Sequence, residues 1–202
     1  RLTAPPQPET RARILFAGSL YGDHTAEPLV EAVARPELRG RAQLEFVGVI
    51  DPRTRHALAE AGVDASVDPP ISWSEAIERM LGAEIAVAIT TPSAGGDMAL
   101  PIKLFEALAL GRPALVLARP NSDSARLLER LGQDAGLAPP DDPAAIAAAI
   151  ERLLANPPPP VAPEALAEFD ADRIAARYAE LLDEVVSRSR SSSSLGTTAS
   201  RR

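Results

Sequence analysis

The chain has 202 residues, a length that suits one well-packed domain and is too short for two large ones. It contains no cysteine, which excludes disulfide bonds, thiolate catalysis and cysteine-ligated zinc. Its formal net charge of −7 argues against a general nucleic-acid binder, because such proteins need a basic surface.

The first half of the chain alternates apolar runs with helical patterns. Residues 1–12 are rich in proline and polar side chains, which predicts a linker or a disordered leader. Apolar runs and turn residues predict strands at Arg13–Gly18, Leu44–Ile50 and Val63–Val67, and helices at Thr25–Ala34 and Arg53–Ala61, with Thr25 as an N-cap. The string Ser72-Trp73-Ser74-Glu75 fits a capping box and predicts a helix to Leu81, beside which Trp73 is expected to pack.

The second half continues the alternation. Ile85–Thr90 is continuously apolar, as in a strand that is buried on both faces of a parallel sheet. After the loop Thr91–Pro101, we expect a helix at Ile102–Leu110, a strand at Ala114–Ala118, a helix at Ser122–Leu131, an edge strand at Gly136–Ala138, a helix at Ala144–Leu154 capped by Asp142, and C-terminal helices at Glu164–Phe169 and Ala171–Ser187. The Ser/Arg-rich residues 188–202 are predicted to form a disordered tail.

This order of elements predicts an α/β fold over residues 13–187: a single Rossmann-like, doubly wound parallel sheet with helices on both faces. Ligands of such sheets bind at the carboxyl ends of the strands, so the loops after Ala17, Gly48, Thr90 and Leu117 are the expected site. No apolar run is long enough for a transmembrane segment, and residues 1–10 carry no signal-peptide core. We therefore expect a cytoplasmic protein.

The first candidate site is the loop Gly18-Ser19-Leu20-Tyr21-Gly22-Asp23. Its two glycines frame a turn between a strand and a helix, where backbone N–H groups can face an anion. The loop lacks the three-glycine dinucleotide fingerprint, and an ordinary tight turn explains the pattern equally well.

The second candidate site is the pair Lys103 and Glu106. The two residues are three apart, so they share a helix face near the mouth of the sheet. In a nucleotide site the lysine would meet a phosphate, and the glutamate would accept hydrogen bonds from ribose hydroxyls. The spacing by itself fits a surface ion pair better, which would contribute only about 0.3 kcal/mol.

Longer strings resemble a known family. The segments PIKLFEALALGRPAL, GLAPPDDPAAIAAAIERLL, GSLYGD and DADRIAARYAELLDEV are similar to the C-terminal donor-binding domain of family 4 retaining glycosyltransferases, which have the GT-B fold. The resemblance covers about Arg13 to Ser187. It implies transfer of a hexosyl group from a nucleotide-diphosphate sugar to an acceptor, with no cofactor and no metal.

The resemblance also implies roles for individual residues. Glu106 would bind the ribose of the donor, and Lys103 would lie beside the donor. The first loop, with Ser19, Leu20 and Tyr21, would lie by the diphosphate, and the stretch with Gly95, Gly96, Met98, Ala99 and Leu100 would approach the transferred sugar.

Many family members carry two glutamates in the pattern Glu-x7-Glu. The second matches Glu106, but the first position is Met98 here. The adjacent Asp97 is the candidate catalytic residue in its place; alternatively it is a loop residue that binds its own backbone.

Partners follow from the same resemblance. The acceptor site of a bacterial-type GT-B enzyme belongs to an N-terminal Rossmann domain that this chain lacks, and that domain would also supply any peripheral contact with the inner membrane surface. Two other functions remain open: a non-catalytic nucleotide-sugar-binding or regulatory module, or an interaction domain that has lost its ligand. Met98 and the absence of a basic residue between Ser19 and Val33 favour the module.

Overall fold

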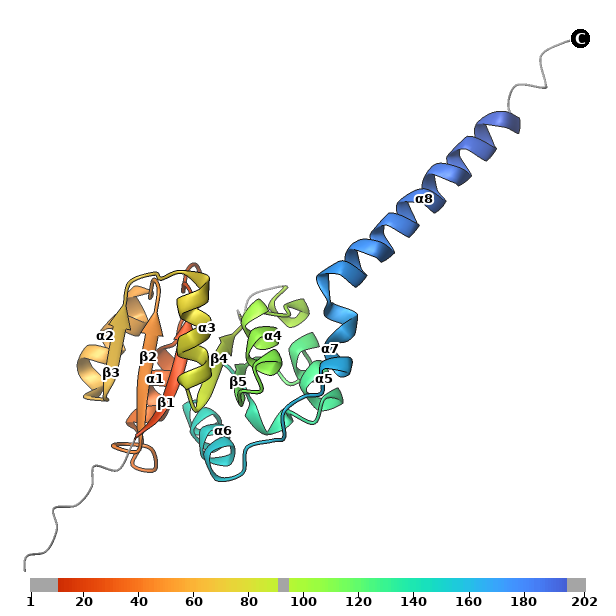
Figure 1. Cartoon of the computed structure of the whole chain (residues 1–202). Coiled ribbons are helices and arrows are strands. Elements are labelled where there is room, and N and C mark those ends of the chain that lie inside the picture. The colour runs from red at the N-terminus through yellow and green to blue at the C-terminus, as the bar shows by residue number, and fades with distance from the viewer. Residues whose placement is uncertain (1–10, 91–94, 196–202) are drawn as a thin grey trace, which may run out of the picture. The chain divides into compact units, whose positions relative to one another are not determined.

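The computed structural model describes residues 11–90 and 95–195 of the chain. They fall into two compact units, divided between Val161 and Ala162. The first unit contains a six-stranded sheet with the strand order β3-β2-β1-β4-β5-β6, in which all pairs are parallel (Figure 1). The predicted single doubly wound parallel sheet is therefore confirmed.

The elements alternate along the chain as expected. The strands are β1 (Ala12–Ala17), β2 (Ala42–Val47), β3 (Ala65–Asp68), β4 (Ile85–Ile89), β5 (Ala114–Leu117) and β6 (Leu137–Ala138). The helices of the first unit are α1 (Glu27–Ala34), α2 (Pro52–Ala61), α3 (Trp73–Gly82), α4 (Ile102–Ala109), α5 (Asp123–Arg130) and α6 (Pro143–Ala155). Short 3-10 turns lie at η1 (Gly96–Met98) and η2 (Asp134–Gly136).

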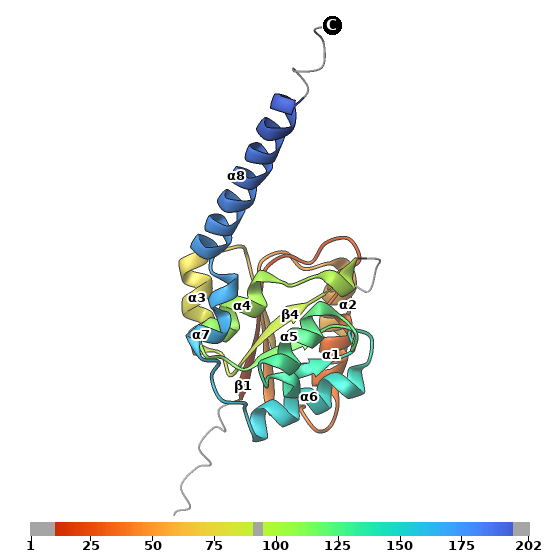
Figure 2. The same ribbon diagram turned by 90° about the vertical axis from the view of Figure 1, so that its right-hand side faces the viewer.

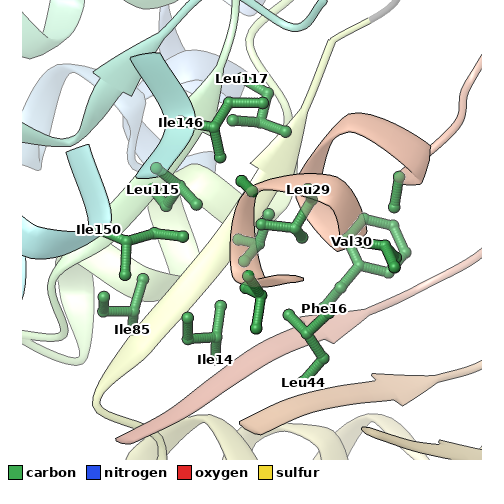
Figure 3. Close-up of a cluster of buried hydrophobic side chains, with 14 of the residues drawn as sticks. Ile14, Phe16, Leu29, Val30, Leu44, Ile85, Leu115, Leu117, Ile146 and Ile150 are labelled. Atoms are coloured by element: carbon green, nitrogen blue, oxygen red, sulfur yellow. The ribbon is translucent and has the colours of Figure 1, made fainter. Parts of the chain in front are cut away.

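The larger part of the core lies between the sheet and helices α1 and α6. Ile14 of β1 pairs in register with Leu44 of β2 and Ile85 of β4, so these side chains form a row on one face. Figure 3 shows this row together with buried side chains of α1 and α6, among them Leu29 and Ile150. Because aromatic residues are scarce, this core consists mainly of branched aliphatic side chains.

The opposite face of the sheet is covered as well. Leu15 of β1 and Val116 of β5 are buried, as are Met80 of α3 and Leu104 and Leu108 of α4. Figure 2 shows α3 and α4 on one side of the sheet and α1 and α2 on the other. Strands with two covered faces need apolar side chains at every position, which explains the uninterrupted apolar runs in the sequence.

Two of the three predicted helix caps are confirmed. Ser72 and Asp142 cap α3 and α6 through their side chains, and Ser72 with Glu75 forms the predicted capping box. Asp51 caps α2 in the same way, which the sequence analysis did not predict. The prediction for Thr25 is wrong, because α1 begins at Glu27 with Ala26 in the cap position. The Thr25 hydroxyl lies 3.2 Å from Asp51 Oδ1, from Thr54 Oγ1 and from the backbone nitrogen of Glu27.

The second unit contains α7 (Pro163–Leu166), η3 (Ala167–Phe169) and α8 (Ala171–Leu195). Asp170 directly precedes α8, and its carboxylate accepts hydrogen bonds from the backbone N–H groups of Asp172 and Arg173. It runs to Leu195, so part of the predicted disordered tail is helical; residues 196–202 and the leader residues 1–10 lie outside the described part. Within the described residues, no helix combines the length and hydropathy that a membrane span requires.

A buried polar cluster joins the starts of α1 and α2, and we expect Thr54→Val to break it. Thr54 is fully buried; its hydroxyl accepts a hydrogen bond from Ala26 N at 2.8 Å and donates to the Asp51 carboxylate. Valine leaves both groups buried without that partner, so the free energy of unfolding should fall by about 1–3 kcal/mol in urea titrations. Thr25→Val removes only the longer contacts of a half-buried hydroxyl, so it should lower the free energy of unfolding by less than Thr54→Val does. Equal losses in the two variants would contradict this account.

Candidate functional site

Loops from different strands meet at the carboxyl edge of the sheet. Gly18 N donates to Val47 O and Leu20 N to Val49 O, both at 2.7 Å, so the loop after β1 continues to pair with the loop after β2. At the end of β4, Thr90 N donates to Leu117 O of β5 at 2.9 Å. These bonds fix the backbone that surrounds the site.

An open cleft of about 470 Å³ lies at this edge. Its lining comes from the end of β1 and the following loop, the end of β2, the segment leading into α3, one side of α3, and the first turns of α4. Three of the predicted site residues line it: Ser19, Lys103 and Glu106.

A second hollow of about 330 Å³ lies next to the cleft. It is lined by half of the other predicted residues, namely Leu20, Tyr21, Ala99 and Leu100, together with His24. Ser19, Ile102 and Lys103 line both hollows, so the two hollows adjoin at the start of α4.

Lys103 lies over the end of β1. The end of the Lys103 side chain lies directly against Gly18, where a Cβ atom would displace it. The ammonium nitrogen is 5.7 Å from the centroid of the Phe16 ring, a cation–π distance. Lys103 is the only lysine in the sequence, and the fold brings its charge to the boundary between the two hollows.

Glu106 is half-buried in the cleft, and its partner is Trp73. Its Oε1 atom accepts a hydrogen bond from the indole Nε1 of Trp73 at 2.8 Å. The alternative of a surface ion pair with Lys103 is wrong, since among the described side chains Glu106 makes no ion pair with that lysine. The carboxylate therefore faces the cleft, as a ligand-binding role requires.

Trp73 is the site residue that the sequence analysis missed. It was expected to pack beside its own helix, but its side chain is 70% exposed and reaches Glu106 of α4 across the cleft. The two residues are 33 positions apart in the chain. No local pattern signals the contact, because only the crossover through β4 places α3 next to α4.

Two charged residues fix the orientation of α3. Hydrogen bonds from the Ser72 side chain and backbone lower the pKa of Glu75 below its ordinary value. Arg79 bonds Asp68 and, at 2.6 Å, Glu45 Oε1, and these bonds raise the pKa of its guanidinium. Arg79 thus ties α3 to β2 and β3, and the capping box orders the first turn of α3, from which Trp73 projects.

The residues expected near the transferred sugar divide into two groups. Ala99 and Leu100 line the second hollow, and Ser124 Oγ donates to Ala99 O at 2.7 Å. Gly95, Gly96, Asp97 and Met98 line neither hollow; Met98 is 73% exposed. Residues 91–94, just before them, lie outside the described part of the chain.

Asp97 and Leu20 differ from their expected roles. Asp97 Oδ2 lies 3.4 Å from Nη1 of Arg119, a half-exposed ion pair in place of the expected contact with its own backbone. The side chain of Leu20 is buried in the core, so only its backbone can face a ligand. Tyr21 is 71% exposed and lies edge-on against His24.

The described residues contain no group of three or more His, Asp or Glu side chains that could hold a metal ion. The chemistry available at the edge of the sheet is therefore that of one cation, one carboxylate, an indole N–H and the Ser19 hydroxyl, against apolar walls. A cation next to a carboxylate suits a ligand that has both an anionic group and hydroxyl groups.

We expect Gly48→Ala to disturb the cleft. Gly48 has a φ of +128°, and a Cβ atom there would overlap the carbonyl oxygen of Gly18. The strained backbone and the clash should lower the free energy of unfolding by about 2 kcal/mol or more, measured in urea. Gly62→Ala is the matched control. Gly62 also has a positive φ, +61°, but a Cβ atom there would meet no neighbouring atom. This variant should therefore lower the free energy of unfolding by about 1 kcal/mol or less.

The capping box gives a pH dependence. Since the folded pKa of Glu75 is lowered, its contribution to stability is fully present above its ordinary value of 4.5 and is lost as the pH falls through the lower folded value. Glu75→Ala should therefore reduce the urea midpoint at neutral pH, and the difference from wild type should shrink on acidification. If the difference in urea midpoint between wild type and Glu75→Ala grew at low pH, the stabilising role of the Glu75 carboxylate would be contradicted.

The matches to known proteins agree with this geometry. Residues 11–156 match the family model described as glycosyl transferases group 1. Among solved structures, the catalytic domain of cholesterol-α-glucosyltransferase from Helicobacter pylori is similar, with a TM-score of 0.60 and 19% identity over 73% of this chain and 88% of that chain. The sequence has no significant match among curated proteins.

The α,α-trehalose 6-phosphate synthase from Burkholderia multivorans is also similar, with a TM-score of 0.54 and 19% identity. That likeness covers 95% of this chain but only 45% of the synthase chain. At this identity the two structures show a shared fold, whereas the family match includes the cleft and most of the first unit. This chain belongs to the glycosyl transferases group 1 family.

Proposed function

We propose that this chain is the donor-binding half of a hexosyltransferase whose donor is a nucleotide-diphosphate sugar. The observation that carries the proposal is the Glu106 carboxylate, which lies in the cleft, hydrogen-bonded to Trp73 and without an ion pair to Lys103. A carboxylate so placed can accept hydrogen bonds from ribose hydroxyls, which a surface ion pair would not favour.

The diphosphate is assigned to the start of α4. Lys103 brings a positive charge to the boundary between the two hollows, and Ser19 lines both of them beside it. In a transferase this cation would stabilise the negative charge that develops on the departing diphosphate, and the cleft would hold the donor in a reactive orientation. The proposal needs no cofactor.

The transferred sugar is assigned to the second hollow. Ala99 and Leu100 line it, and it continues from the cleft past Lys103, as a sugar attached to a diphosphate requires. Asp97 lies outside both hollows and pairs with Arg119, so we assign it no catalytic role. Transfer with retention, as in the family 4 enzymes, belongs to this proposal as well.

The acceptor is assigned to a second domain outside this chain. Tyr21, Val49, Met98 and Ile102 are large apolar side chains with 54% to 74% of their surface exposed, and all lie in segments that follow β1, β2 and β4. A cluster of exposed apolar side chains at a binding edge is typical of an interaction surface. We propose that an acceptor-binding Rossmann domain covers it in a cytoplasmic enzyme.

A non-catalytic nucleotide-sugar-binding module is the second candidate. It is favoured by Met98 at the position of the first family glutamate and by the pairing of the neighbouring Asp97 with Arg119. The two candidates share the donor site and differ in chemistry, so transfer of the sugar once an acceptor domain is joined to the chain would distinguish them.

We expect the chain to bind UDP, GDP or ADP in calorimetric titrations. Glu106→Gln should weaken that binding by about tenfold or more, since a hydrogen bond to a charged group is worth about 1.5–3 kcal/mol. Glutamine keeps one acceptor oxygen for Trp73, but it removes the charge and replaces the second acceptor oxygen by an NH2 donor. Glu31→Gln, an exposed change on α1, should leave the affinity unchanged. Absence of binding at millimolar nucleotide, or no loss in Glu106→Gln, would overturn the proposal.

A further inference from the structure

The bond between Trp73 and Glu106 points to a function for the tryptophan. We propose that Trp73 is a positioning residue: its indole N–H holds Oε1 of Glu106, so that the carboxylate is already oriented toward the two ribose hydroxyls before the nucleotide arrives. This inference rests on the proposed function of Glu106 and adds to it the residue that sets the affinity for the ribose.

The exposure of Trp73 shows that packing does not fix its side chain. With 70% of its surface exposed, the indole ring is not held by the core, although tryptophan is usually largely buried. Its polar contact is the 2.8 Å hydrogen bond to Glu106 Oε1. The bond therefore orders the indole ring and the carboxylate together.

The two residues that form the bond, Trp73 and Glu106, both project from ordered helices. Trp73 is the first residue of α3, directly after Ser72, whose side chain and backbone bond Glu75 in the capping box. On the other side, α4 is anchored by Leu104, Ala107 and Leu108, which are all buried. The bond thus links two rigid helices across the cleft.

The bond has a specific consequence for the carboxylate. A free glutamate side chain samples several rotamers, and ordering it on ligand binding costs free energy. Trp73 restricts those rotamers in advance. A carboxylate has about four acceptor positions, so one indole N–H leaves Oε2 and a second position on Oε1 for two hydroxyl groups.

Nothing else in the described lining of the cleft can replace this carboxylate. Its polar side chains are Ser19, Trp73, Lys103 and Glu106, and Glu106 is the one acidic group among them. Recognition of the ribose hydroxyls therefore depends on Glu106 and on the residue that orients it.

The contact can be tested without a ligand, since Trp73 is the only tryptophan in the chain and gives a single indole N–H signal in a ¹⁵N-labelled protein. Glu106→Ala should shift that signal toward the position of a solvent-bonded indole. Glu31→Ala should leave it in place. An indole signal that does not respond to Glu106→Ala would overturn the inference.

The positioning role is tested with Trp73→Phe, which keeps an aromatic ring and removes the N–H donor. The probes are the nucleoside diphosphate that wild type binds most tightly among UDP, GDP and ADP, and its 2′,3′-dideoxy counterpart. We expect about fivefold to tenfold weaker binding of the ribonucleotide, as for the loss of one hydrogen bond, and less than about twofold change for the dideoxy nucleotide.

The ratio of the two affinities distinguishes positioning from a general structural effect. A merely structural role would weaken both nucleotides in parallel, and an indole that competes with the ligand would give tighter ribonucleotide binding in Trp73→Phe; either result would overturn the inference. If wild type and Glu106→Gln behave as expected but Trp73→Phe equals wild type, this inference fails and the proposed function stands. If wild type binds no nucleotide, the proposed function fails first and the inference with it.

Discussion

The parallel direction of all the paired strands is the constraint from which the site follows. Parallel neighbours cannot be joined by a tight hairpin, so the chain returns through a helix after each strand, and the helices cover both faces of the sheet. Only the edges at the strand ends remain open. The loops after β1, β2 and β4 leave the sheet at the same edge. There the segments after β1 and β2 bond each other, and Ser19 and Gly48 in them line the cleft.

Close approach of backbone at this edge shapes the cleft. Gly48 lies against the carbonyl of Gly18, and Gly18 lies beneath the side chain of Lys103. Because neither glycine has a side chain, the loop after β1, the loop after β2 and the start of α4 come close together here. The buried cluster of Thr25, Asp51 and Thr54 holds the start of α1 against the start of α2 behind them. These contacts fix the backbone from which the polar groups of the cleft project.

The polar groups of the cleft are few and complementary. Lys103 supplies a positive charge, Glu106 a hydrogen-bond acceptor, and Trp73 a donor that faces that acceptor, while the remaining walls are mostly apolar. This is the composition of a small-molecule site, in which a small number of placed polar groups gives orientation. All three residues lie within residues 11–156, the part of the chain that matches the glycosyl transferases group 1 family.

The sequence by itself determined the α/β class, the alternation of strands and helices, two of the helix caps, and the helix face that Lys103 shares with Glu106, because each of these depends on neighbours within a few residues. Only the tertiary structure decided that Trp73 meets Glu106, that Asp97 pairs with Arg119, that Leu20 points into the core, and that α1 starts after Thr25. The physical reason is that these contacts join residues brought together by crossover connections. Local periodicity carries no information about which helix lies beside which, or about the partner a polar side chain finds there.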